Sequence, residues 1–515
     1  MVELPTEIWT IIASHIPDHY FMPLLSLNRV FLKLAMDKRY GTVDLSCDNS
    51  ETHRFIDFLK NDYAADAVHT LLLSNQLREV LIRQERIDRS RWLRGLSCLI
   101  TCTSTRLPKP FALYPIYTQK SSKQIAKEVD EVLLKLRNVK HLTAAWDNCT
   151  SDDVKPHSRA WPARAAGLEW SGFAAGLETL RLRISALFLP VLFQHVAWPE
   201  NLGELSIEIL YPLFAEPIAP AVLMNVFRCV SSLINKLHRL KSLAITLGWP
   251  VDFSSLFLSL GRYLAVHWLS STDLSSATGK FPELRNLSLH LPLYGLHLSD
   301  TCGLLRFVRE HADIIENFTL HLKGCGRPSL GWDAEGASEY CSQILRQSLP
   351  RLTSLDLDLG ALRRPSEADV FLAKFGTAKL RSVRIRGLVM SLGNLHSLSR
   401  SFPHDAALRH LTVQVASIGK ALFDLLSQSF PHLHSLCLVA SGIAYWSIVH
   451  DRLHRELSAE NADYSDWPLH HLTIRGDGFF EAGIRSDVLP FMQRYIPSLR
   501  TFNGCGTRRS YLSWQ

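Results

Sequence analysis

The stretch Leu349-Pro350-Arg351-Leu352-Thr353-Ser354-Leu355-Asp356-Leu357-Asp358 carries the pattern from which the architecture of this chain follows. From Ser354 onward polar and apolar side chains alternate, and this period of two is typical of a short strand with one buried face. Pro350 closes the segment before the strand, because a proline cannot continue a helix. The stretch therefore predicts the end of a helix, a turn and a half-buried strand.

The same pattern, an apolar residue followed three and five residues later by two more, recurs along most of the chain. Clear copies begin at Leu177, Leu202, Leu240, Leu284, Ile315, Leu352, Leu380, Leu408, Leu433 and Leu469, and weaker copies begin at Val68, Val139 and Leu499. Helix-like stretches lie between copies, such as 222–237, 341–349 and 421–429. Strand–turn–helix units repeated about every 25–44 residues are typical of a solenoid. A non-repetitive α/β domain with alternating strands and helices is the alternative.

The repeats resemble the irregular leucine-rich repeats of fungal and plant F-box proteins. The Asn or Cys that usually follows the strand in such repeats is absent from most copies, and the spacing of the copies drifts. The resemblance implies an α/β fold in which parallel strands alternate with helices, with long insertions in some repeats.

In leucine-rich repeats the strand residues between the buried leucines face the concave side of the sheet. The resemblance implies that a substrate is held there, by Arg181, Arg183, His290, His321, Asp356, Asp358, Arg384, Arg386 and Arg475. An aspartate pair in this set neighbours an arginine pair on the next predicted strand. Either these four charges neutralise one another, at about 0.2–1 kcal/mol per pair, or they form a charged platform for a partner's tail or degron.

The first forty residues carry a second pattern, of short apolar helices. Pro5 suits the first turn of a helix, and Glu7 places a negative charge beside the positive end of the helix dipole. Helical spacing then places on one stripe Ile8, Ile11, Ile12 and Ile16. The next apolar run places on one face Leu24, Leu27, Phe31 and Leu34. Because about forty residues rarely fold alone, we expect this segment to pack against a partner, the rest of the chain, or both.

Residues 3 to about 45 resemble an F-box. Leu4-Pro5-Thr6-Glu7-Ile8 matches the opening of that family, Ile11 and Ile12 match the apolar pair of its first helix, and Leu27-Asn28-Arg29-Val30-Phe31 matches its close. The resemblance implies binding to the Skp-type adaptor of a cullin–RING ubiquitin ligase. The residues that we expect to bind the adaptor are Leu4, Pro5, Ile8, Ile11, Leu24, Leu27 and Phe31. The predicted domains are an F-box-like helical module at 1–45 and an irregular leucine-rich-repeat solenoid with insertions at 46–515.

Composition places the chain among globular proteins. Of its 515 residues 47% are hydrophobic and 20% are charged, which is typical of a folded chain. The net charge of +7 is small for this length and requires neither nucleic acid nor an anionic membrane as a partner. The start has no signal-peptide pattern, and no apolar run approaches the ~18 residues of a membrane span. Ten scattered cysteines form no framework and are interpreted as reduced thiols, so we expect a cytoplasmic or nuclear location, or both.

No motif for catalysis, cofactor binding or metal binding stands out. The chain lacks a phosphate-binding glycine loop, a Gly-x-Ser-x-Gly elbow and a His-Glu-x-x-His zinc motif. Several histidines near repeat boundaries have no paired ligand spacing and are interpreted as solvated or capping; they are His404, His432, His434, His470 and His471. We therefore expect no cofactor, no metal and no enzymatic activity.

These patterns together predict a substrate-recruiting subunit of an SCF-type cullin–RING ubiquitin ligase. Its N-terminal helices would bind the Skp-type adaptor, and its repeats would hold an unknown protein substrate, with no nucleic acid or membrane involved. The alternative is a leucine-rich scaffold that joins proteins without a ligase, in which the N-terminal helices merely cap the hydrophobic end of the repeats. A third hypothesis is an enzyme on an α/β fold, which a deep pocket with clustered, pKa-perturbed residues would support.

Overall fold

The chain forms two compact units, Met1–Arg239 and Leu240–Gln515, and each is described by itself. The computed structural model describes residues 4–17, 20, 24, 29–46, 50–74, 122–146, 176–186, 189, 199, 201–210, 220–249, 256–257, 260, 281–293, 302–324, 343–344, 349–360, 379–402, 407–440, 446–459, 462–476 and 488–502. None of the described helices is both long enough and apolar enough to cross a membrane.

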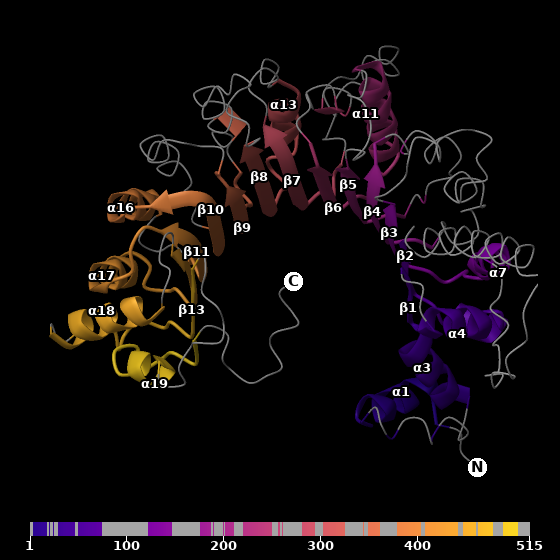
Figure 1. The fold of residues 1–515 in the computed structure, drawn as a ribbon, viewed down its shortest axis with the longest axis horizontal. Coiled ribbons are helices and arrows are strands. Elements are labelled where there is room, and N and C mark those ends of the chain that lie inside the picture. Colours follow the sequence, from indigo (N-terminus) through magenta and orange to yellow (C-terminus); the bar gives the residue numbers. More distant parts are fainter. Residues whose placement is uncertain are drawn as a thin grey trace, which may run out of the picture. The chain divides into compact units, whose positions relative to one another are not determined.

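The first unit is a run of parallel strands that alternates with helices (Figure 1). Its strands are β1 (Thr42–Leu45), β2 (Thr70–Ser74), β3 (His141–Trp146), β4 (Thr179–Ser185) and β5 (Glu204–Leu210). Its helices are α1 (Thr6–Ser14), α3 (Arg29–Tyr40), α4 (Ser50–Leu59), α5 (Asp62–Asp66), α7 (Ser122–Leu133) and α11 (Pro220–Ile234). Each of these strands pairs in parallel with the next one along the chain.

The second unit continues the same alternation. Its strands are β6 (Ser242–Leu247), β7 (Asn286–Leu293), β8 (Asn317–Gly324), β9 (Ser354–Asp358), β10 (Ser382–Met390), β11 (His410–Val415), β12 (Ser435–Ala440), β13 (His471–Gly476) and β14 (Thr501–Phe502). Its helices are α13 (Cys302–Glu310), α16 (Leu392–Ser401), α17 (Lys420–Ser429), α18 (Trp446–Ala459) and α19 (Val488–Gln493). Figure 1 shows α16 and α17 on one side of β10 and β11, and none of the described helices lies on the opposite side of these two strands.

The repeated apolar positions form the core of both units. All thirty residues of the ten clear copies are at most 3% exposed. Equivalent residues lie side by side across the strands, as in the series Leu355, Val383, Leu411, Leu436 and Leu472. This ladder, together with parallel pairing, confirms the predicted leucine-rich-repeat fold class, and the non-repetitive α/β alternative is wrong.

The weaker copies are also strands, since β2, β3 and β14 lie where they were predicted. The helix predicted at 421–429 is α17, and the helix predicted at 222–237 is α11, which begins two residues earlier and ends three residues earlier. The stretch 341–349 lies mostly outside the described residues. The sequence pattern missed β1, whose four residues offer only two buried positions, Val43 and Leu45.

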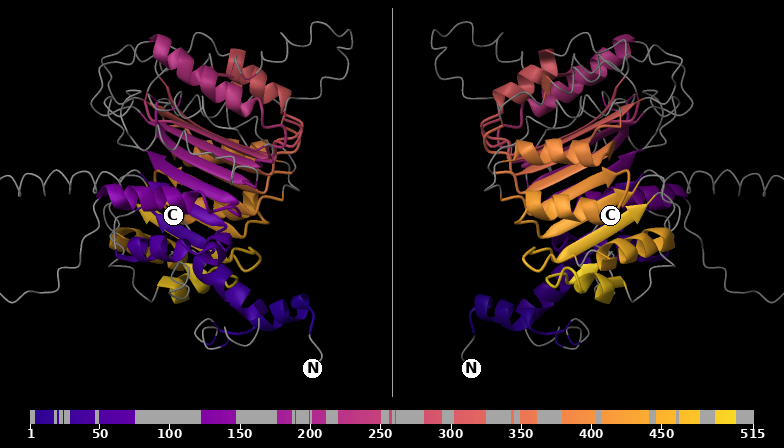
Figure 2. Two further views of the ribbon diagram at one scale, coloured as in Figure 1. Left: turned by 90° about the vertical axis from the view of Figure 1, so that its right-hand side faces the viewer. Right: turned by 90° about the vertical axis from the view of Figure 1, so that its left-hand side faces the viewer.

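The N-terminal helices form a small core of their own. Ala13 of α1 packs with Phe31 and Ala35 of α3, and these three are buried. Around them pack the partly buried residues Trp9, Ile16, Leu24 and Leu34. Helix α3 also contacts β1, whereas α1 packs against α3. Figure 2 accordingly shows the indigo helix α1 beyond the strands of the first unit.

Candidate interaction surfaces

The outer side of α1 is an exposed apolar face, which consists of Leu4, Ile8, Ile11 and Ile12. These four side chains are 42%, 41%, 56% and 37% exposed, respectively. Of the eleven large hydrophobic side chains that are exposed among the described residues, five lie in residues 4–20. The first helix therefore concentrates apolar surface that the chain itself does not bury.

Helix α1 has this face because its apolar residues cover more of the helix than the side that packs against α3, while its polar residues Thr6, Glu7, Thr10 and Ser14 share the remaining side. Its inner side is formed by Trp9, Ala13 and Ile16, which recur at the i, i+4 and i+7 spacing of one helical face. Trp9 meets Phe31 edge to face, with ring centroids 5.3 Å apart. The predicted stripe of four isoleucines is thus divided: Ile16 packs inward, and the other three point outward.

The other residues predicted to bind the adaptor occupy three kinds of position. Pro5 is exposed and precedes the first helical residue. Leu24 is partly buried, and Phe31 is only 2% exposed, so both belong to the small core of α1 and α3. Leu27 lies outside the described residues.

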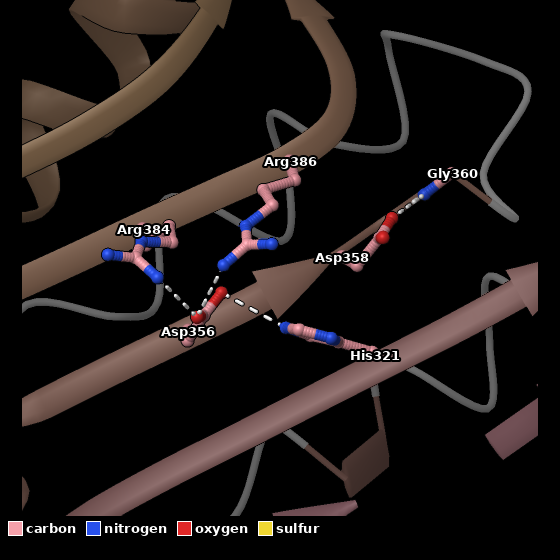
Figure 3. Close-up of polar contacts among 6 residues, drawn as sticks. All are labelled: His321, Asp356, Asp358, Gly360, Arg384 and Arg386. Carbon is pink, nitrogen blue, oxygen red and sulfur yellow. Dashed lines mark hydrogen bonds and ion pairs between the residues drawn. The ribbon is translucent and has the colours of Figure 1, made fainter. Parts of the chain in front are cut away.

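On the strand face of the second unit, Asp356 contacts two arginines and a histidine, as Figure 3 shows. One carboxylate oxygen, Oδ1, lies 3.1 Å from His321 Nε2. The other, Oδ2, accepts hydrogen bonds from Arg384 Nη1 at 3.3 Å and from Arg386 Nη2 at 3.1 Å. Asp356 is 19% exposed, whereas the two arginines are 40% and 45% exposed.

Of the two aspartates that were predicted to pair with the two arginines, only Asp356 does so, and it binds both arginines. The strand register places Asp356 opposite Arg384 and Asp358 opposite Arg386, as the sequence indicated. Arg386 nevertheless reaches diagonally to Asp356. The carboxylate of Asp358 instead accepts the backbone N–H of Gly360 at 3.0 Å, in the turn that follows β9 (Figure 3).

The electrostatics of Asp356 follow from these contacts. Burial raises the pKa of this carboxyl, but the hydrogen bond from His321 and the charges of Arg386, His321 and Arg384 outweigh it and lower the pKa below 3.8. Asp356 is thus ionised at neutral pH and offsets one of its neighbouring positive charges. This favours mutual neutralisation over an open charged platform at this point of the sheet.

The remaining predicted face residues lie around this cluster or apart from it. The His290 and His321 rings are neighbours, with centroids 4.2 Å apart. Arg475 is exposed on β13. Burial raises the pKa of the nearby Cys437 thiol, and the positive charges of Arg475, Arg384 and Arg386 lower this pKa by less. In the first unit Arg183 lies 3.6 Å from Glu208, its partner in the strand register, and Arg181 is exposed.

Two sets of residues were missed by the sequence analysis. Ile12 was recognised as apolar but was not assigned to the adaptor-binding set, although it belongs to the exposed face. The second set, which we name the basic row, is Arg381, Arg409, His434, His470 and Arg500. Its two histidines were interpreted as solvated or capping, and the row as a whole was not recognised. Each member directly follows the first apolar residue of a repeat, so comparison of that one position between copies would have revealed it.

Within the described ranges, no group of three or more His, Cys, Asp or Glu side chains is placed to hold a metal ion. What these surfaces offer is an apolar helix face and a set of strand-borne charges, both of which suit contacts with other macromolecules.

Comparisons with known proteins give two solved structures of low similarity. The sequence matches no protein-family model and no curated protein. Among solved structures it is similar to the leucine-rich repeat-containing protein LegL7 from Legionella pneumophila, with 17% identity and a TM-score of 0.33 over 62% of this chain and 91% of that chain. It is also similar to a structure of the Rad7 and Elc1 complex in yeast, with 14% identity and a TM-score of 0.38 over 84% of this chain and 96% of that chain. The leucine-rich-repeat character rests on the strands and the buried ladder of this chain itself.

Proposed function

We propose that this chain is a substrate-recruiting adaptor of an SCF-type cullin–RING ubiquitin ligase, in which α1 docks onto a Skp-type protein. The single observation that carries the proposal is the exposed apolar face of α1. Contiguous apolar surface of this kind marks contacts with other proteins. The F-box resemblance of residues 3 to about 45 names the partner class.

Burial of this face supplies part of the free energy that docking requires. A large aliphatic side chain contributes about 1.5–3 kcal/mol when it is fully buried. The four side chains of the face are already about half-buried, so a partner that covers them gains roughly 3–6 kcal/mol. Further contacts to Pro5 and to the polar rim of the helix would bring the total into the range of specific complexes.

Phe31 and Leu24 would act indirectly in this complex. Because both belong to the core that α1 shares with α3, we expect them to hold the docking helix in place, and Phe31, at 2% exposure, is too buried for direct contact with the adaptor. The alternative role of an N-terminal cap on the repeats suits α3, which contacts β1, better than it suits α1.

The repeats would supply the second half of the function. Parallel strands that are fixed by a common buried ladder form a rigid support, and a rigid support raises the effective concentration of a bound substrate near the ligase. No catalytic step is assigned to this chain; its role would be to position the substrate near the ligase.

Co-expression with a Skp-type adaptor, followed by gel filtration, tests the proposal. The wild-type chain is expected to co-elute with the adaptor. The double change Ile8→Asp with Ile11→Asp is expected to abolish co-elution, because it buries two carboxylates in an apolar contact.

Leu134→Asp is the matched control for this experiment. Leu134 follows α7 and is 57% exposed, against 56% for Ile11, so it tests the cost of a charge at an equally exposed apolar position. Circular dichroism checks that each variant is folded. A folded wild-type chain that elutes apart from the adaptor would refute the ligase role and leave a scaffold without a ligase.

A further inference from the structure

The basic row lies immediately before the strands β10 to β14 and runs across all five of them. Its members are joined by backbone hydrogen bonds, each N–H donating to the carbonyl of the previous member: Arg409 to Arg381 at 2.8 Å, His434 to Arg409 at 2.8 Å, His470 to His434 at 2.9 Å and Arg500 to His470 at 2.8 Å. At the ~4.8 Å spacing of strands the row is about 19 Å long.

In other repeats, the residue that directly follows the first apolar residue forms an ion pair with its counterpart in the next repeat. In the first unit Lys140 lies 2.9 Å from Glu178, and in the second Arg285 lies 3.6 Å from Glu316. The basic row contains no acidic member. Of the residues that the structure describes, none forms an ion pair with Arg381, Arg409 or Arg500, and these three arginines are exposed.

The two histidines of the row lie close to other basic side chains, and for His470 burial and this proximity both lower the pKa. The rings of His434 and His470 are 5.2 Å apart. Burial, followed by the charges of Arg500, His434 and His471, lowers the pKa of His470. Such mutual repulsion is relieved when an anion binds among the cations.

We propose that the basic row binds an acidic segment of a partner protein. This deepens the proposed function, on which it rests for the role of that partner as the recruited substrate. An extended peptide advances ~3.3 Å per residue, so about six residues span the row. Charge complementarity supplies orientation and a fast approach, and the exposed Arg475 on the adjoining strand face extends the positive surface.

The surface suits a protein better than a nucleic acid. Proteins that bind single strands stack bases on aromatic side chains as well as neutralising phosphates. The exposed aromatic rings among the described residues are Tyr20, Phe58 and Tyr63, and all three belong to the first unit. The row consists of basic side chains arranged in a line, which complements the negative charges of an extended acidic peptide.

Fluorescence anisotropy with fluorescein-labelled octaglutamate and the full chain, without any adaptor, tests this inference. The wild-type chain is expected to bind the peptide, with an affinity that falls as salt is added. Arg409→Glu combined with Arg500→Glu is expected to weaken binding by about tenfold or more, because two attractions become repulsions. The milder pair Arg409→Gln and Arg500→Gln serves if charge reversal impairs folding.

The matched control is Arg400→Glu combined with Arg494→Glu. Arg400 belongs to α16 and Arg494 follows α19, and both are exposed, so the change in net charge is the same. The control is expected to keep its affinity within about twofold. Absence of peptide binding, equal loss in the control, or equal binding of a labelled octa-uridine RNA would overturn the inference. Because the assay contains no adaptor, such a failure leaves the co-elution result, and with it the ligase role, unaffected.

Discussion

Asp356 is the residue at which the charge of the strand face is balanced. Two arginines and a histidine converge on its carboxylate, so this part of the sheet offers less positive charge to a partner than its sequence suggests. The basic row, which has no such carboxylate, keeps its charge. The cluster around Asp356 is thus partly neutralised, whereas the basic row is not.

We predict that Asp356→Asn lowers the free energy of unfolding by about 1–3 kcal/mol at neutral pH, because it leaves partly buried cations without their counter-ion. The effect depends on pH. Since the folded-state pKa of Asp356 lies below 3.8, its stabilising contribution is complete above that value and is lost as the pH falls through the folded pKa. Urea unfolding at a series of pH values measures both effects.

The wild-type chain and the Asp356→Asn variant should therefore converge in stability as the solution becomes strongly acidic. Asp358→Asn is the companion variant, because Asp358 accepts a backbone N–H and holds no arginine. If the difference between wild type and Asp356→Asn were constant over the whole acidic range, the ion-pair account would be wrong.

Among the elements, β10 departs furthest from a regular repeat strand. Its pairing with β11 is in step up to Ile385 and resumes at Val389, so that the three residues between them have no partner there. Gly387 lies in this bulge with a φ of +73°, which L side chains rarely adopt. A Cβ at this position would also collide with the backbone of Gly360.

We predict that Gly387→Ala costs about 2–3 kcal/mol of unfolding free energy, from the strained backbone and the collision together. Gly393→Ala, in the neighbouring α16, is the matched control. A Cβ there makes only ordinary contact with Ser391 Oγ, at 3.6 Å, and should leave stability unchanged or slightly raised. Thermal unfolding of the two variants compares them, and equal melting temperatures would contradict the prediction.

The strands were largely predictable, because a buried ladder demands apolar residues at fixed spacing and the sequence shows them. The pairing partner of Arg386 was not, since the strand register places Arg386 opposite Asp358, whereas the carboxylate of Asp358 accepts the backbone N–H of Gly360 in the turn after β9. The outward side of α1 was not predictable either. The apolar sector of this helix is wider than one packed face, so the sequence does not indicate which part of that sector the neighbours cover; here Trp9 and Ala13 lie inward.

At the scale of the whole molecule, the repeats of each unit contact mainly their neighbours in the chain. Stability in such arrays is close to a sum of terms for each repeat and for each junction. Damage to one repeat should accordingly remain near that repeat. This is the property that would let one end of the chain bind a ligase while strands elsewhere hold a partner.

We predict that Leu438→Ala, at a fully buried position of β12, costs about 2–5 kcal/mol and acts locally. Amide hydrogen exchange should become faster in β11, β12 and β13 and stay unchanged in β2 and β3. Leu182→Ala, at a buried position of β4, is the reciprocal variant and should affect β3 to β5 alone. Uniformly faster exchange after either change would show that the chain unfolds as one cooperative body.

The bulge of β10 also bears on how such a chain changes over evolutionary time. Three additional residues are taken up at the end of one strand, and β11 still pairs in step with β12 over six residues. An insertion or deletion at such a site alters the local surface and leaves every later repeat in place. New binding specificities can thus arise at the strand ends by small changes of length, while the buried ladder that specifies the fold is inherited intact.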